Sequence, residues 1–138
     1  MLQRIQTVWL LLAGVFAFLT IRYPIYTGTK LTNDINEFTP LSAGSNLLLL
    51  IFTVALGLLP VITIFLYKNR SLQIKLTLAA LGVYIICSVF YFNAIKNFTQ
   101  GATSFWSVFY FMIPLLLLFA IRGIYRDQKL VKSIDRLR

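Results

Sequence analysis

Four apolar stretches, each about as long as a bilayer core is thick, dominate this chain. They cover residues 5–21, 47–67, 76–95 and 105–121. A helix needs roughly 20 mainly apolar residues to cross a hydrocarbon core that is about 30 Å thick. Hydrophobic residues make up 59% of the 138 residues and charged residues only 12%, roughly half the charged share of a soluble domain. The sequence therefore predicts an all-α integral membrane protein, a four-helix bundle that forms a single domain over residues 1–138.

Cationic residues gather at alternate ends of these stretches. If the N-terminus is cytoplasmic, the outer side holds three of the 13 Lys and Arg residues, namely Arg22, Lys30 and Lys96. The cytoplasmic side then holds Arg4, Lys68, Arg70, Lys75, Arg122, Arg126, Lys129, Lys132, Arg136 and Arg138. Because cytoplasmic loops carry an excess of Lys and Arg close to helix ends, we expect an N-in/C-in protein with both termini in the cytoplasm.

Two connections between the stretches differ in length. The segment Lys68-Asn69-Arg70-Ser71 predicts a tight turn, which makes the second and third helices antiparallel neighbours. Ser71 is a candidate N-cap of the third helix. Residues 23–46 form a long outer connection, which we interpret as a floppy or lightly structured cap in preference to a functional loop.

The residue types that support catalysis are scarce. The chain has no His, a single Cys87 in the middle of the third stretch, and four Asp and Glu residues. No Asp, Glu, Lys or Arg lies in the middle of a stretch, where ionisable residues mark ion and proton pathways. We therefore expect no enzyme activity, no catalytic, metal or cofactor site, and no proton-coupled transport. The net charge of +9 is dispersed beside helices without a recognition motif, so no nucleic-acid partner is expected.

Pro60 and Pro114 interrupt the second and fourth stretches, which run in the same direction. Each is followed by a Phe five residues later and by a cation eight residues later. Prolines at matching positions of two halves can mark broken helices around a transport site. The simpler interpretation is that both are helix kinks, because Pro is common in membrane helices.

Residues 122–138 form a basic tail with helical periodicity. At 100° per residue, Leu130, Val131, Ile134 and Leu137 fall on one side and the cations on the other. The candidate partner-binding or lipid-binding residues of the tail are Arg126, Asp127, Lys129, Leu130, Val131, Lys132, Ile134, Asp135, Arg136, Leu137 and Arg138.

We expect the tail either to continue the fourth helix or to lie along the membrane surface. Its function has two interpretations. As an amphipathic anchor it binds anionic lipids of the cytoplasmic leaflet, each cation contributing about 1 kcal/mol. As a docking helix it packs its apolar side against a partner protein. Asp127 falls near the apolar side, which is unfavourable unless its carboxylate meets a cation or a helix N-terminus.

Three motifs carry a resemblance to a known family. They are Met1-Leu2-Gln3-Arg4-Ile5-Gln6-Thr7 at the start, Lys68-Asn69-Arg70-x-Leu72-Gln73 in the middle, and Asp127-x-Lys129-Leu130-Val131-x-Ser133-x-Asp135-Arg136-Leu137-Arg138 at the end. The whole chain resembles the Bacteroidota membrane proteins grouped as domain of unknown function 4293, with Leu2 and Gln128 where Ile and Glu are commoner. The resemblance implies a four-helix protein of the bacterial inner membrane and implies no activity.

These observations favour a small structural or accessory subunit that contacts another membrane or cytoplasmic protein through its cytoplasmic face. A homo-oligomer is an alternative form of the same interaction. The alternative from another class is a small channel or carrier for a neutral or lipidic solute, with Pro60 and Pro114 near its path.

Overall fold

Each apolar stretch forms one long helix in the computed structural model, which describes residues 2–32 and 35–135. The helices are α1 (Leu2–Arg22), α2 (Leu47–Phe65), α3 (Arg70–Ile95) and α4 (Ser107–Asp135). Each is long and apolar enough to cross a membrane, which confirms the expectation of four helices of spanning length. The helices and the apolar stretches differ in their bounds, most of all where α3 begins at Arg70, six residues before the third stretch, and where α4 continues past residue 121 to Asp135.

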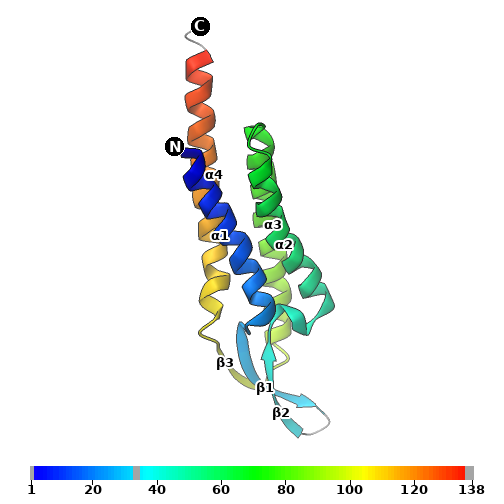
Figure 1. The fold of residues 1–138 in the computed structure, drawn as a ribbon. Coiled ribbons are helices and arrows are strands. Elements are labelled where there is room, and N and C mark those ends of the chain that lie inside the picture. Colours follow the sequence, from blue (N-terminus) through cyan, green and yellow to red (C-terminus); the bar gives the residue numbers. More distant parts are fainter. Residues whose placement is uncertain (1, 33–34, 136–138) are drawn as a thin grey trace.

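The helices form a bundle whose two ends differ (Figure 1). α1 packs against α2 and α4, and α3 packs against the same two helices. The start of α1, the α2–α3 connection and the end of α4 lie at one end, called the turn end below. The opposite end carries the strands and is called the sheet end.

Small residues on α1 let its neighbours approach closely. Ala13 and Ala17 are fully buried, and a Cβ added to Gly14 would lie 3.1 Å from the carbonyl oxygen of Gly57 on α2. Lipid tails solvate apolar side chains about as well as another helix does, so membrane helices associate through close packing of this kind. α1 is therefore the helix on which α2 and α4 are assembled.

Most polar side chains described inside the helices are satisfied locally or by the next helix. The hydroxyls of Thr63 and Thr77 donate to the carbonyls four residues earlier, both at 2.7 Å. Ser88 on α3 lies 2.8 Å from the hydroxyl of Tyr110 on α4. The Nε2 of Gln73 on α3 donates to the carbonyl of Thr63 on α2 at 3.0 Å. The Ser88 and Gln73 bonds connect neighbouring helices, as polar contacts commonly do between membrane helices.

The fold is mostly helical, and it also contains a small sheet that the expectation of an all-α protein did not include. The strands β1 (Tyr26–Thr32), β2 (Ile35–Leu41) and β3 (Gln100–Thr103) form an antiparallel sheet in the order β2-β1-β3. The register pairs Thr32 with Ile35, so β1 and β2 are joined by two residues as in a hairpin. The long outer connection is therefore structured in its described residues.

The sheet joins two connections that are far apart in the sequence. β1 pairs with β3 in the connection between α3 and α4, and Gly28 lies opposite Gly101. A Cβ on Gly28 would clash with the backbone of β3, since Gly101 Cα would be 2.8 Å away. Ile25, Leu41 and Ala43 are buried beside this sheet, at the ends of the helices. The strands thus hold the α1–α2 and α3–α4 connections against each other.

The α2–α3 connection is a tight turn, as predicted, but a different residue caps α3. The Oδ1 of Asn69 accepts the backbone N–H of Leu72 at 3.4 Å, and Ser71 lies inside the helix. Asn is as good an N-cap as Ser, and the earlier start of α3 moves the cap two residues back.

Substituting Gly28 with Ala should separate β1 from β3 because the added methyl group would meet backbone atoms that have no room to move. We expect faster amide hydrogen exchange in β1 and β3 and a lower melting temperature in detergent. Gly44→Ala is the matched control, since a Cβ there meets only ordinary contacts at 3.4 Å and beyond. Equal exchange in the two variants would contradict the role assigned to this close approach.

Candidate docking surface at the turn end

The tail predicted from the sequence is the C-terminal part of α4. At 1.5 Å per residue, the 29 residues of α4 span roughly 43 Å, whereas the 19 residues of α2 span roughly 28 Å. α4 consequently extends beyond the rest of the bundle at the turn end, where its red end rises past the start of α1 (Figure 1). The prediction that the tail continues the fourth helix is confirmed as far as Asp135.

One ion pair holds this extension against the bundle. The Nε of Arg70, the first residue of α3, lies 3.0 Å from the Oδ2 of Asp127 on α4. Both side chains are largely shielded, with exposed fractions of 23% and 15%. Asp127 therefore meets the cation that its place near the apolar side of the helix requires. The sequence did not identify Arg70 as the partner of Asp127. It did indicate that Asp127 has a cationic partner, because an isolated acid near the apolar side of a helix is otherwise unfavourable.

Two apolar side chains next to this ion pair are left uncovered. Leu130 and Val131 lie three and four residues after Asp127, so they share its side of the helix. Their exposed fractions are 50% and 37%. The rest of the bundle covers both side chains only in part. An apolar surface here, on a helix fixed in place, is suited to contact with another protein.

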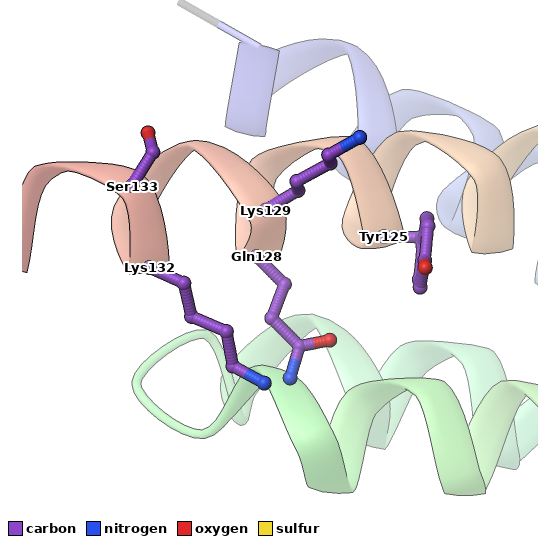
Figure 2. A pocket seen from close by; sticks show the side chains of 5 residues that line it. All are labelled: Tyr125, Gln128, Lys129, Lys132 and Ser133. Carbon is purple, nitrogen blue, oxygen red and sulfur yellow. The ribbon is translucent and has the colours of Figure 1, made fainter. Parts of the chain in front are cut away.

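Cationic and polar side chains surround a hollow of about 320 Å³ on another side of the extension. Figure 2 shows the residues that line it, Tyr125, Gln128, Lys129, Lys132 and Ser133. Gln128 and Lys132 extend toward the pale green ribbon of the α2–α3 region, whereas Lys129 points elsewhere. The cations thus point in different directions around the helix. Such an arrangement is better suited to contact with an extended acidic surface than with a single acidic side chain.

Part of the predicted set is beyond what the structure describes. Arg136, Leu137 and Arg138 lie outside the described residues, and so do the side chains of Ile134 and Asp135. The exposed apolar surface therefore consists of Leu130 and Val131 among the described side chains. Arg126 is exposed and lies toward α1, where it lines a second cavity.

The two prolines do not come together. Pro60 is fully buried in α2, and Pro114 is half-buried in α4. α2 and α4 are not one of the closely packed helix pairs among the described residues. Both helices continue through their prolines. A buried Pro60 does not line an open path in this conformation.

The described acidic residues are also separated. Glu37 lies on β2 at the sheet end, whereas Asp127 lies at the turn end. Among the described residues, no group of three His, Cys, Asp or Glu side chains is placed to hold a metal ion. The turn end thus combines an ion pair, exposed apolar side chains and surrounding cations.

The fold and this surface define a small, mostly helical protein with four helices of membrane-spanning length and one helix that extends beyond the bundle. The chain belongs to the family described as domain of unknown function (DUF4293), whose model matches residues 2–137. Comparisons with curated proteins and with solved structures gave no match.

Removing either partner of the Arg70–Asp127 pair should destabilise the α4 extension. Arg70→Gln or Asp127→Asn leaves a shielded charge without its partner, and we expect the free energy of unfolding in detergent to fall by roughly 1–2 kcal/mol. The double variant Arg70→Asp/Asp127→Arg restores an ion pair and should recover part of this loss. Purely additive effects in this double-mutant cycle would show that the two side chains are not coupled.

Proposed function

We propose that this protein is a structural or accessory subunit of a bacterial inner membrane, which binds a partner protein through the exposed side of the α4 extension. The observation that carries the proposal is the pair Leu130 and Val131, exposed on a helix that Asp127 attaches to Arg70. A flexible tail would lose conformational entropy on binding, whereas a fixed helix presents its side chains already ordered.

The surface favours a partner with both apolar and acidic residues. Leu130 and Val131 supply the apolar contact, and Lys129 and Lys132 lie on the adjoining sides of the same helix. Burying a Leu side chain contributes about 1.5–3 kcal/mol, whereas exposed charge pairs contribute less than about 1 kcal/mol each. The apolar pair is accordingly expected to supply most of the affinity and the cations to favour an acidic partner.

The distribution of charge supports an orientation with the turn end in the cytoplasm. Lys68, Lys75, Arg122 and Arg126 are exposed cations near the helix ends on this side. The sheet end carries fewer, and the positive-inside rule assigns the cation-rich end to the cytoplasm. In this orientation the α4 extension is accessible to both membrane and cytoplasmic partners.

Reporter fusions test the orientation directly. Fusions of a compartment-sensitive enzyme after residues 33, 70, 100 and 138 should report outside, inside, outside and inside, because each helix reverses the direction of the chain. Any other order would overturn the proposed topology and with it the cytoplasmic location of the docking surface.

A charged residue within the apolar pair should abolish docking. Purification of the full-length protein in mild detergent from its native host is expected to recover a partner in constant ratio. Leu130→Asp should lower that recovery at least about ten-fold, because it removes about 1.5–3 kcal/mol of apolar burial. A photoreactive residue at position 131 should crosslink to the same partner.

The matched control places the same acid on another side of α4. Tyr125→Asp adds an equal charge at an exposed position five and six residues before Leu130 and Val131, which at 100° per residue lies on a different side of the helix. It should leave recovery within about two-fold of the parent, as should Lys129→Gln, since single exposed charges contribute little. If all three variants lose the partner equally, charge and not the apolar pair controls binding.

The channel or carrier interpretation remains the alternative from another class. It predicts flux of a neutral or lipidic solute in liposomes that is lost on Pro60→Ala. The burial of Pro60 gives it no structural support, so the docking function is preferred.

A further inference from the structure

A second cavity at the turn end lies between α1 and α4 and has a different character from the docking surface. Its volume is about 350 Å³, and residues of both helices line it, among them Gln6 and Trp9 of α1 and Phe119, Arg122 and Arg126 of α4. Neither the predicted set of tail residues nor the proposed docking function accounts for Gln6, Trp9 or Phe119.

The cavity is apolar toward the middle of the bundle and cationic toward its end. The rings of Trp9 and Phe119 are in contact, with centroids 5.5 Å apart, and Phe119 is half-exposed. Arg122 and Arg126 follow three and seven residues later on α4, so they lie one and two turns nearer the turn end on the same side. Both are exposed, and neither forms an ion pair with a described side chain. An amphipathic anion would match this gradient.

A buried hydrogen-bond donor lies in the wall of the cavity. Gln6 is only 6% exposed, and its Nε2 has no hydrogen-bond partner among the described residues. Its side chain lies against Gly123 of α4, where an added Cβ would be 2.7 Å from Gln6 Cγ. The absence of a side chain at position 123 therefore provides the room that Gln6 occupies. A buried amide without a partner is unfavourable by itself, and most such groups in proteins are satisfied.

We propose that this cavity binds the phosphate of an anionic phospholipid from the leaflet at the turn end, with Arg122, Arg126 and Gln6 as donors and the acyl chains beside Trp9 and Phe119. Guanidinium groups bind phosphate oxygens through paired hydrogen bonds, and the Gln6 amide supplies one more donor. The proposal does not depend on partner docking, because Leu130 and Val131 take no part in it.

Fluorescence quenching by brominated lipids tests the site in the full-length protein. Trp9 and Trp106 are the two Trp residues, so Trp106→Phe leaves Trp9 as the only indole. The protein is reconstituted in phosphatidylcholine, and brominated phosphatidylglycerol or brominated phosphatidylcholine is titrated in. We expect phosphatidylglycerol to quench Trp9 at a mole fraction at least about five-fold lower, the advantage that one cation near the membrane surface gives.

Variants separate a built site from general attraction of anionic lipid. Arg122→Gln/Arg126→Gln should abolish the preference for phosphatidylglycerol, and Gln6→Leu should reduce it while retaining side-chain volume. The control Lys68→Gln/Lys75→Gln removes the same charge at the same end outside the cavity and should keep the preference. Circular dichroism checks that each variant is folded, and the single variant Arg126→Gln replaces the double one if that does not fold.

Three results would overturn the proposal. Equal quenching by the two brominated lipids in the parent would show that the cavity does not select an anionic lipid. An equal loss of preference in the arginine and lysine double variants would assign the effect to net charge. Relief of quenching by soluble glycerol phosphate at concentrations well below those of the lipid would assign the site to a free phosphate compound.

Discussion

Hydrocarbon provides no hydrogen-bond partner for a polypeptide backbone, so a segment that crosses a membrane must satisfy its own N–H and C=O groups. Helices meet this requirement, but lipid gives them little hydrophobic reason to associate. Small residues of α1 favour association of the helices by another route. Ala13, Gly14 and Ala17 let α2 and α4 pack closely against α1. α3 completes the bundle by packing against these two helices. The position of every other feature depends on this close packing around α1.

The two ends of the bundle have different structures, one closed by a sheet and the other with a protruding helix. This difference is the reason binding is expected at the turn end. At the sheet end, β1 pairs with both β2 and β3. It thereby joins the α1–α2 connection to the α3–α4 connection, which is distant in the sequence. At the turn end the helices have unequal lengths, and α4 extends beyond its neighbours. This extension meets α3 through Asp127 and Arg70 and meets α1 where Gly123 accommodates Gln6. Two different binding surfaces can therefore lie on one helix, one toward a partner protein and one toward lipid.

Sequence periodicity was informative where the structure is local and failed where it is not. The four helices were predicted from runs of about 20 apolar residues, and the continuous tail from its 3.6-residue period. The sheet was missed, although Thr27, Thr29 and Thr32 favour a strand over residues 26–32. The pairing with the third strand could not be found from a local pattern. Gly28 lies in the α1–α2 connection and Gly101 in the α3–α4 connection, so α2 and α3 separate them in the sequence. Likewise, nothing in the local pattern distinguishes Gln6 from an ordinary polar residue at a helix start.

The amino-acid sequence by itself determined the number of long apolar helices, their order and the unequal distribution of cations between the two ends. These properties belong to consecutive residues, and hydropathy and spacing report them directly. The tertiary structure alone decided that Arg70 meets Asp127, that Gln6 lies against Gly123, and that Leu130 and Val131 remain uncovered. Each of these contacts depends on how the helices are rotated about their axes and how far one extends past another. Packing across the bundle sets those rotations, and no single segment of the chain contains them.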